Sequence, residues 1–588
     1  MKRGAVIGCL TWHGGGRQYR RMLKSDGRTV GRSDNPRMAV VALAGIVFLS
    51  ASPTVRLSGQ LSPRDSAVHA LNRLAYGPRP GDVDRVARGG VMRWIDEQLA
   101  PERIDDPALA TRERQFDLLN YSREDLARLY LDAQRARRER QQAQRADSMM
   151  SPPADQAEQT PEGLRARRLA GQLQELAVVR AALAERQLQE VMVDFWTNHF
   201  NVFLGKGADR FLMPSYVQET IRPRVLGKFA DLLIATARSP AMMFYLDNWE
   251  SVTPGSRPPS PAFPLSAMRR GGQGVRFPRD PMRADSLRRR AEQRMPQGIN
   301  ENYARELMEL HTLGVDGGYS QRDVIEVARI FTGWSIAPPP RGGGFEFHDW
   351  AHDRGAKTVL GVAFPAGHGE DEALRLLTLL ASSPATMHHV SRRLCARFVA
   401  DDPPDGCVDA AVAAWQRTGG DIREVLRAIF HSPDFWAAQN VRAKVKTPLE
   451  FVVSAVRAVR ADPDTTARLA QVVARLGEPL YLHVAPDGYP ERQEDWLNSG
   501  ALLARMNAAV AIAAGRLPGA AVDLDSLVPA TADRDALVAA VNEAILAGTM
   551  SEHTKTVIRD QLSDISDPRQ ARALAIGLAL GGPDFQRQ

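Results

Sequence analysis

The chain has few cysteines and no long apolar run. Of its 588 residues only three are cysteine, and the longest uninterrupted apolar stretch, residues 38–49, has 12 residues. A helix that crosses a bilayer needs about 20 apolar residues, so no segment has the length of a transmembrane span. The sequence also lacks an HExxH pair, a G-x-S-x-G elbow, a P-loop and a dinucleotide-binding fingerprint. Elbow-type hydrolase, kinase and Rossmann chemistry therefore lose support.

The apolar stretch has the flanks of a secretory signal. Three arginines between residues 28 and 37 precede it, and the small residues 50–52 follow it. Basic residues before a short apolar core and small residues after it are typical of a cleaved signal peptide. A buried hydrophobic helix is the alternative, but nothing amphipathic precedes the stretch to pack against it. We predict that residues 1–51 are a signal peptide, with a translation start at Met22, and that the protein is exported to the periplasm or the extracellular space.

The positive charge of the chain is concentrated in this leader. Residues 1–37 hold nine Lys and Arg against two Asp, a balance of +7 that equals the formal net charge of the whole chain. Residues 38–51 carry no charge, so the mature protein is close to neutral. The sequence pI of 9.4 would otherwise suggest binding to nucleic acid. We predict instead that no nucleic acid is bound, and that no transmembrane span remains after the signal is removed.

Helical periodicity dominates the mature sequence and predicts an all-α, multi-helix globular protein with one small β-hairpin. The hairpin, residues 345–360, is expected to pair residues 345–348 with residues 357–360 across a wide loop. Residues 253–298 hold ten Arg against three acidic residues beside Pro, Gly and Ser, which indicates a disordered or loosely held basic insertion. Contact with an anionic surface is the alternative for this insertion. The remaining segments are an N-terminal helical region at 52–134, a charged linker at 135–163, core helices at 164–252 and 299–520, and C-terminal helices at 521–588.

Two cysteines, Cys395 and Cys407, remain once the leader is removed. They stand 12 residues apart, with the turn-forming residues 401–406 (DDPPDG) between them. A bridge across such a short loop would contribute about 3 kcal/mol in the chain-entropy model. Because the protein is expected to be exported, we predict a disulfide between them, with two unpaired thiols as the alternative.

Residues 300–334 (NENYARELMELHTLGVDGGYSQRDVIEVARIFTGW) combine a charged helix, a Gly-rich turn and a second, amphipathic helix. On a wheel centred on Tyr303, leucines at 307, 310 and 313 share the apolar face. Glu306 lies about 60° from Tyr303, inside this face, whereas its charged neighbours fall on the solvated side. A buried charge is costly unless it is paired. Glu306 is therefore either held in a polar network or used as a catalytic residue or metal ligand.

A second candidate is His199, in the segment 190–200 (EVMVDFWTNHF). It falls near the middle of an apolar helical face centred on Phe195. A lone histidine in such a place is more often a core residue with one hydrogen bond, and a role as acid, base or metal ligand is the alternative. Asp194 and Asn198 flank it at helical spacing and could orient it or share a site.

Weaker signals add further candidates. Asp247 and Asn248 end a helix, where they could simply form a cap or turn, and His352 with Asp353 lies in the expected hairpin loop. The residues singled out for binding are Asn198, Asp247, Asn248, Asn302, His311 and Lys357. The residues singled out for metal binding are His199, Glu306, His352 and Asp353. This second set would suit a divalent metal ion as cofactor, with nitrogen and oxygen ligands, although no known ligand spacing supports it.

Several segments together resemble the bacterial "domain of unknown function 1800" family. They are LNRLAYGPRPGDV, FWTNHFNVF, YLDNWES, the stretch at 300–334, the HD…K…LG stretch at 352–361, and WLNSGALLARMN, and they extend from about residue 64 to 515. The resemblance implies an exported protein without an established reaction. It also implies a partner, because members of the family are often associated with sulfatase-like exported proteins, and hence a shared role in the envelope or outside the cell.

Two functions remain open. We predict a non-catalytic cell-envelope or extracellular accessory or binding protein that acts with a sulfatase-like exported partner. The alternative is a metal-assisted hydrolase of envelope or extracellular polymers, in which His199 and Glu306 serve as metal ligands or as acid and base. The first function is favoured because the sequence holds no recognised catalytic spacing.

Overall fold

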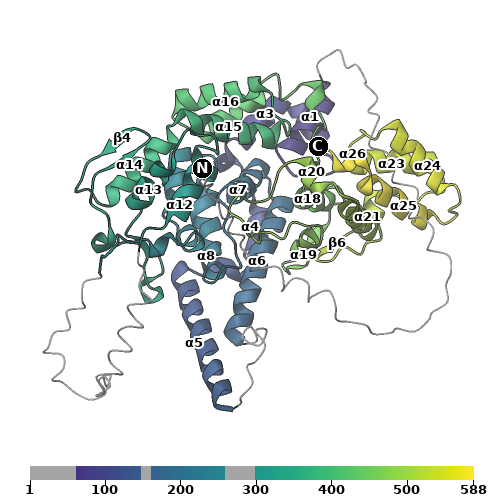
Figure 1. The fold of residues 1–588 in the computed structure, drawn as a ribbon. Helices are drawn as coiled ribbons and strands as arrows, with labels where there is room; N and C mark the ends of the chain where they lie inside the picture. The colour runs from purple at the N-terminus through teal and green to yellow at the C-terminus, as the bar shows by residue number, and fades with distance from the viewer. Residues whose placement is uncertain (1–60, 148–159, 258–297) are drawn as a thin grey trace, which may run out of the picture. The chain divides into compact units, whose positions relative to one another are not determined.

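Most of the described chain is helical, as the periodicity predicts (Figure 1). The computed structural model describes residues 61–147, 160–257 and 298–588, which belong to one unit, Gln60–Gln588. The predicted signal peptide, most of the basic insertion and residues 148–159 of the linker lie outside the described residues. Within the described ranges, no helix combines the length and the apolar character that a membrane crossing requires.

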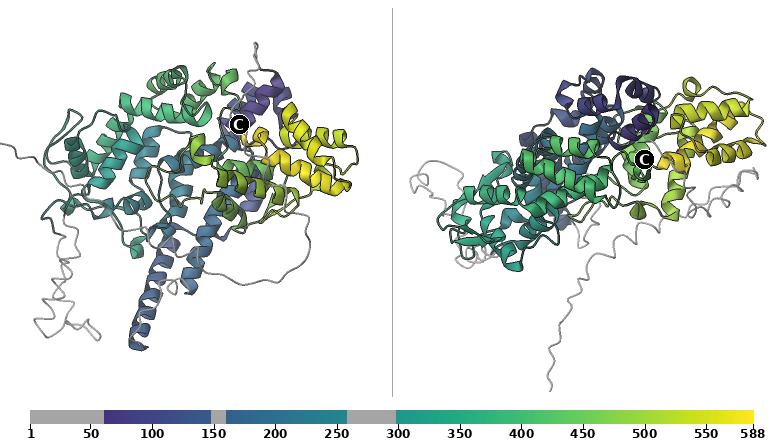
Figure 2. Two further views of the ribbon diagram at one scale, coloured as in Figure 1. Left: turned by 45° about the vertical axis from the view of Figure 1, so that its right-hand side comes forward. Right: turned by 90° about the horizontal axis from the view of Figure 1, so that it is seen from above.

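The helices of the first half of the chain are α1 (Pro63–Arg73), α2 (Asp82–Gly89), α3 (Val91–Gln98), α4 (Pro107–Glu113), α5 (Arg123–Asp147), α6 (Pro161–Leu183), α7 (Gln187–His199), α8 (Asp209–Ser215), α9 (Phe229–Ala237) and α10 (Pro240–Tyr245). Among them, α6 packs against α4, α5, α7 and α8, and α7 also packs against α3. Helices α5 and α6 lie side by side and extend away from the other helices, as Figures 1 and 2 both show.

The second half continues the helical architecture and contacts α6. Its helices are α12 (Glu301–Glu306), α13 (Gln321–Ile330), α14 (Glu370–Ala381), α15 (Pro384–Phe398), α16 (Asp405–Thr418), α17 (Ile422–His431), α18 (Pro448–Ala458), α19 (Arg468–Arg475), α20 (Gln493–Trp496), α21 (Ser499–Ala513), α22 (Leu524–Leu527), α23 (Arg534–Leu546), α24 (Glu552–Leu562), α25 (Pro568–Gly581) and α26 (Pro583–Gln586). Helices α18 and α19 pack on α6, and α21, α23 and α24 pack on α25.

Local sequence sets where several helices begin. Ser62 caps α1 by accepting a hydrogen bond from the Asp65 backbone N–H, with proline at the first helical position. Ser320 and Asp323 form a reciprocal capping box at the start of α13, as the sequence predicts. Thr447 opens α18 with a second capping box. These caps satisfy backbone donors that would otherwise be unpaired at the helix starts.

The expected single hairpin is wrong in its pairing. Strand β1 (Trp334–Ile336) pairs antiparallel with β2 (Phe345–Phe347), and β3 (Lys357–Val359) pairs antiparallel with β4 (Val362–Phe364). Each strand therefore pairs with its nearest neighbour in sequence, and the two expected partners belong to different hairpins. The β3–β4 hairpin closes through only two residues, 360–361, and such a turn is cheaper to close than the wide loop that the sequence suggested. A further two-residue pair joins β5 (Asp462–Pro463) to β6 (Ala520–Ala521).

The Arg- and Gln-rich segment 123–147, whose composition predicts a charged helix, forms helix α5, so the first part of the linker assigned to 135–163 is helical. Helix α5 continues to Asp147, and Thr160 caps α6, which begins at Pro161. The Arg- and Gln-rich residues after position 134 are good helix formers and extend α5 without needing a buried face.

The helix expected around Tyr303 is interrupted by a π-helical segment. Helix α12 ends at Glu306 and the π-helix η8 (Leu307–Thr312) follows it directly. A π turn adds a residue, so the face predicted for a regular α-helix shifts past this point. Met308 and His311 are buried, whereas Glu306 and Leu310 are only half-buried. The prediction that Glu306 is buried on the apolar face is therefore wrong.

Cys395 of α15 and Cys407 of α16 are joined by a disulfide, as predicted, with Sγ atoms 2.10 Å and Cα atoms 6.3 Å apart. Both residues are fully buried. The bridge closes the connection between two helices that already pack against each other.

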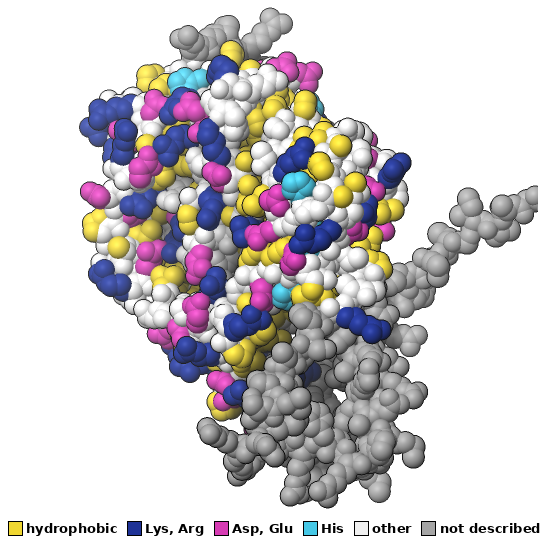
Figure 3. Space-filling view, turned by 90° about the vertical axis from the view of Figure 1, so that its left-hand side faces the viewer, with side chains coloured by type: hydrophobic (Ala, Val, Ile, Leu, Met, Phe, Trp, Pro, Cys, Tyr) yellow, Lys and Arg dark blue, Asp and Glu magenta, His cyan; other side chains and the backbone are white. Residues whose placement is uncertain are grey.

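Charges of both signs are mixed on the face shown in Figure 3. Lys and Arg side chains (dark blue) alternate with Asp and Glu side chains (magenta), and hydrophobic atoms appear between them. This face carries no large field of one sign of the kind that a nucleic-acid phosphate backbone attracts.

Candidate functional site

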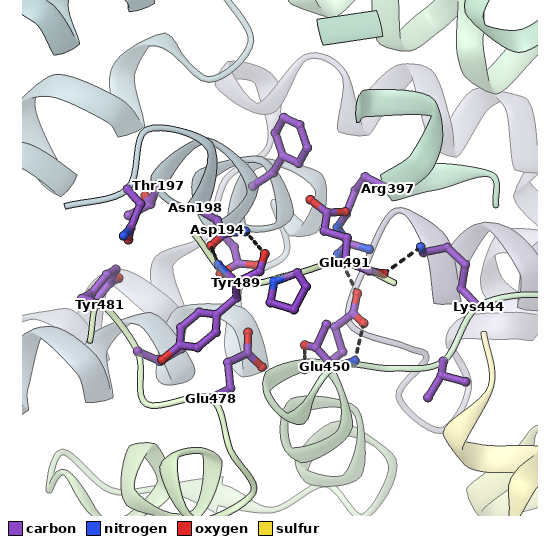
Figure 4. A pocket seen from close by; sticks show the side chains of 16 residues that line it. Asp194, Thr197, Asn198, Arg397, Lys444, Glu450, Glu478, Tyr481, Tyr489 and Glu491 are labelled. Carbon is purple, nitrogen blue, oxygen red and sulfur yellow. Dashed lines mark hydrogen bonds and ion pairs between the residues drawn. The ribbon is translucent and has the colours of Figure 1, made fainter. Parts of the chain in front are cut away.

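A polar cavity of about 60 Å³ lies where α7, α15, α18 and the segment 477–492 meet (Figure 4). Its ionisable and hydrogen-bonding residues are Asp194, Thr197, Asn198, Asn201, Arg397, Lys444, Thr447, Glu450, Glu478, Tyr481, Tyr489 and Glu491. We call it the Asp194 cavity. It has room for roughly four water molecules, or for one small polar group, at about 15 Å³ each.

Asn198 ties the segment 477–492 to α7. Its amide nitrogen donates to the Tyr489 carbonyl at 2.8 Å, and its amide oxygen accepts from the Tyr489 backbone N–H at 2.7 Å. These two bonds are dashed in Figure 4. The paired bonds fix the backbone of Tyr489 against the helix that carries Asp194 and Thr197.

An ion pair between Arg397 and Glu450 forms one wall of the cavity. The two side chains are 2.7 Å apart, and both are almost completely buried. Glu450 also accepts hydrogen bonds from the Thr447 backbone N–H at 2.8 Å and from the Gln588 side chain at 2.9 Å. Burial alone would raise the pKa of Glu450, but Arg397 and these hydrogen bonds hold it below its usual range. Glu450 is therefore ionised at neutral pH.

Asp194 presents a carboxyl group to the cavity without a hydrogen-bond partner among the described residues. Burial raises its pKa to about 7, and the positive charge of Arg397 offsets the burial only in part. Part of the side chain remains open to the cavity, where water or a ligand can reach it. Asp194 thus changes between an acid and a carboxylate near neutral pH.

Glu478 is a second protonated acid in the same cavity. Burial, together with the nearby Asp194, raises its pKa to about 8. The Leu449 backbone N–H donates to its carboxyl oxygen at 2.7 Å. Glu491 adds a fourth carboxyl group, after those of Glu450, Asp194 and Glu478, and its Oε2 is buried without a hydrogen-bond partner in the described part of the chain. Lys444 is already engaged, since it pairs with Asp401 and donates to the Glu491 carbonyl at 3.3 Å.

The cavity therefore places carboxyl groups in different protonation states side by side. A neutral acid both donates and accepts a hydrogen bond, whereas an ionised one only accepts. Environments that push the pKa values of neighbouring acids apart are found at acid–base sites and at sites that bind hydroxyl or amine groups.

His199 lies outside this cavity, in the packed core. Arg393 donates to its Nδ1 at 2.8 Å, so Nε2 carries the proton and donates to the His311 carbonyl at 3.2 Å. Burial, with the positive charge of Arg393, lowers the pKa of His199 well below its ordinary value. Both ring nitrogens are thus used within the protein.

Glu306 and its neighbours stand apart from the cavity lining. Burial and the nearby Glu309 raise the pKa of Glu306, and Asn302 is exposed. His311 is buried, and burial with Arg393 lowers its pKa to about 3. Among the described residues, the His311 Nε2 atom has no hydrogen-bond partner.

The Asp247–Asn248 turn is not part of the lining of the Asp194 cavity. Asp247 is exposed, has a left-handed backbone at φ 59°, and pairs with Lys206 at 2.7 Å. Asn248 is buried, and its side-chain amide has no hydrogen-bond partner in the described ranges. A turn at this position was one of the two roles that the sequence left open.

His352, Asp353 and Lys357 anchor the hairpins. Lys357 donates to Glu372 at 2.7 Å, and His352 lies 3.4 Å from the same carboxylate. Asp353 pairs with Arg329 at 2.7 Å. The residues predicted as metal ligands therefore have separate partners, and within the described ranges no group of three or more His, Cys, Asp or Glu side chains is arranged to hold a metal ion.

Sequence reasoning found two lining residues of the cavity, Asp194 and Asn198, through their helical spacing. It missed Arg397, Glu450 and Glu478, which come from segments about 200 residues or more away from them. The motif at Thr447–Glu450 has the pattern of an ordinary capping box. Only the fold shows that this capping glutamate also meets a buried arginine.

The family model described as "Protein of unknown function (DUF1800)" matches residues 69–587. The chain belongs to this family. The match confirms the resemblance that the motifs suggest, and every residue named in the Asp194 cavity falls within the matched region. No curated protein and no solved structure matches the chain.

Proposed function

We propose that this member of the family is an exported, non-catalytic binding protein of the envelope or extracellular space. It would hold a hydroxyl- or amine-bearing end group of a polymer in the Asp194 cavity and act beside a sulfatase-like exported partner. The buried Cys395–Cys407 disulfide supports export, because such bridges persist mainly in oxidising compartments.

The observation that carries the binding proposal is the unpartnered carboxyl of Asp194. Buried polar groups are normally hydrogen-bonded, so a carboxyl without a partner in a polar cavity favours a ligand that supplies one. A hydroxyl or ammonium group would donate to Glu491 or Glu450 and exchange hydrogen bonds with Asp194. The volume of about 60 Å³ suits an end group rather than a chain segment.

Acid–base hydrolysis is the second candidate, and the pKa of Asp194 favours it. A general acid or base works best when its pKa lies near the operating pH, and that of Asp194 is about 7. In this version Asp194 would give a proton to the leaving oxygen as its bond to carbon breaks, and the ionised Glu450 would stabilise the positive charge that develops. A water molecule would then add to the carbon and return a proton to the Asp194 carboxylate.

Titration calorimetry with glucosamine and glucose, which carry an amine and hydroxyl groups, tests the binding proposal. We expect Asp194→Asn to weaken binding roughly tenfold, the cost of one charge-assisted hydrogen bond. Asp209→Asn is the matched control, because Asp209 is also a buried acid with a raised pKa but does not line the cavity. Equal affinity in wild type and Asp194→Asn would refute the proposal.

Product analysis of the same incubations separates binding from hydrolysis. A disaccharide of either sugar, incubated with the protein, stays intact if the function is binding alone. Cleavage by wild type that disappears in Asp194→Asn and persists in Asp209→Asn would favour the second candidate.

Cell fractionation tests the location, and co-expression tests the partner. An exported protein is recovered outside the cytoplasm, lacks the leader, and has no free thiol at Cys395 or Cys407. The sulfatase-like partner should co-purify with the tagged chain after co-expression of the two proteins. Recovery of an unprocessed chain in the cytoplasm would contradict the proposed location.

A further inference from the structure

Lys446 is a buried lysine without a polar partner. Only 3% of the residue is exposed. Its Nζ lies 4.1 Å from the centre of the Phe585 ring, and no described residue accepts a hydrogen bond from it or forms an ion pair with it. An ammonium group removed from water is costly unless it is paired, and contact with one aromatic ring compensates only part of that cost. A bound anion would supply the charge partner that the ammonium group of Lys446 lacks.

Lys446 lines a cavity of about 30 Å³ that is separate from the Asp194 cavity. The charged residues lining it are Arg442, Lys446, Asp584 and Arg587, three basic against one acidic. Thr549 and Asn72 add polar groups, and the rest of the lining is largely apolar. We call it the Lys446 cavity. It has room for one compact group.

The single acidic residue of this cavity is already in use. Asp584 accepts hydrogen bonds from the Ser551 backbone N–H at 2.9 Å and from the Ser551 hydroxyl at 2.8 Å. Arg442 lies 3.7 Å from its other oxygen. Asp584 therefore does not neutralise Lys446, and the cavity keeps an excess of positive charge.

Arg442 has a strained backbone conformation. Its φ is 56°, in the left-handed region that residues other than glycine rarely adopt. Its guanidinium donates to the Thr549 carbonyl at 3.1 Å. A strained backbone that fixes a charged side chain at a cavity is common at ligand sites. A fixed guanidinium beside an ammonium is a frequent arrangement for binding oxyanions.

We propose that the Lys446 cavity binds one small oxyanion, a phosphate or a carboxylate group, held by Lys446 and Arg442. Burial lowers the pKa of Lys446 to about 7. Among the surrounding charges, that of Glu450 raises this pKa, and those of Arg442 and Arg505 lower it. The amine is therefore poised between its two forms, and a bound anion stabilises the charged form.

The anion site adjoins the Asp194 cavity through one short segment. Lys444, Val445 and Thr447 line the Asp194 cavity, while Lys446, between them, lines the other one. The Lys446 and Lys444 backbones also bond to the last residues of the chain, at Gln586 and Gln588. The anion proposal does not rest on the proposed function, because its residues and its ligand are different.

Titration calorimetry of the purified protein with inorganic phosphate and, separately, with acetate tests the site, with sodium chloride at matched ionic strength as the blank. We expect binding of at least one probe, weakened roughly tenfold or more in Lys446→Met by loss of a charge-assisted hydrogen bond. The methionine keeps an apolar stem against Phe585, so the unliganded variant should melt at the same or a higher temperature than wild type.

Two further variants make the result specific. Arg442→Asn removes the guanidinium but tolerates the left-handed backbone, and it should also weaken binding. Lys555→Met removes a lysine of α24 that pairs with Glu552, away from the cavity lining, and it should bind like wild type. Stronger binding of phosphate identifies a tetrahedral ligand, and stronger binding of acetate a carboxylate. Failure of wild type to bind either probe, or equal binding by Lys446→Met, would overturn the proposal.

Discussion

Gly488 lies so close to Asn198 that a Cβ atom at Gly488 would come within 2.4 Å of the Asn198 carbonyl oxygen. Gly488 also has a φ of +75°, which L side chains rarely adopt. Only glycine allows the segment 477–492 to approach α7 closely enough for Asn198 to bond the backbone of Tyr489. This contact forms the Asp194 cavity.

Gly488→Ala should therefore destabilise the protein and open the cavity. We expect a loss of roughly 2–3 kcal/mol, because the clash with backbone adds to the strain of a positive φ. Urea unfolding measures the change. Gly361→Ala is the control, since Gly361 has a φ of +77° but open space around it, and should lose only about 1 kcal/mol. Equal losses in the two variants would show that the close approach to Asn198 is unimportant.

Arg397→Met should be severely destabilising. It leaves the buried carboxylate of Glu450 without its cation, and breaking one side of a buried pair typically costs about 3–5 kcal/mol. Arg341→Met breaks an exposed pair with Glu346 and should cost less than about 1 kcal/mol. Chemical unfolding of both variants gives the comparison. A small loss in Arg397→Met would mean that Glu450 accepts a proton with little penalty.

The stability of the protein should fall as pH rises from about 4 to about 7. In this range Asp194 keeps its proton in the folded protein and loses it in the unfolded chain. The pKa of Asp194 is about 7 in the folded protein and about 4 in an unfolded chain. Between these values the folded state binds the extra proton, so the free energy of unfolding decreases with pH and then levels off above about 7.

The slope from this group is at most about 1.4 kcal/mol per pH unit, because the folded and unfolded states differ by at most one proton at Asp194. Asp194→Asn lacks this slope. It should therefore gain stability relative to wild type between pH 5 and pH 8, as measured by urea unfolding at several pH values. A difference that stays constant with pH would contradict the raised pKa of Asp194.

His199→Ala and Glu306→Ala should behave differently. His199 is fully buried with both ring nitrogens bonded, so its truncation should cost about 3 kcal/mol. Glu306 is half-buried, and its pKa is raised by burial and by Glu309, so its loss should change stability by less than about 1 kcal/mol. Thermal unfolding of the two variants distinguishes them. A larger loss of stability in Glu306→Ala than in His199→Ala would contradict this prediction and show that Glu306 is structurally important.

The contrast between these two residues shows what the sequence could predict. Helical periodicity was sufficient for the fold class and for the position of His199 in the core. It misplaced Leu310, because a π turn at Leu307–Thr312 shifts the helical face and leaves no clear mark in the sequence. Glu306 precedes this turn and is half-buried at the edge of the apolar face, a degree of burial that the wheel does not resolve.

The candidate site was harder to predict for a different reason. Asp194 and Asn198 lie on the same helix as His199, and their helical spacing from it predicted that they could share a site. Arg397, Glu450 and Glu478 become site residues only through contacts between distant helices and a loop. The disulfide could be predicted because the two cysteines after the leader allow only one pairing, whereas the strands could be paired in several ways.

The most direct test of the account is a ¹³C NMR titration of the Asp194 carboxyl group, assigned by comparison with Asp194→Asn, without and with glucosamine. We predict a midpoint near pH 7 in the free protein, moved to lower pH when the ammonium group of the sugar binds, because a nearby positive charge favours the carboxylate. A midpoint near pH 4 that glucosamine leaves unchanged would contradict both the protonated acid and its role in binding.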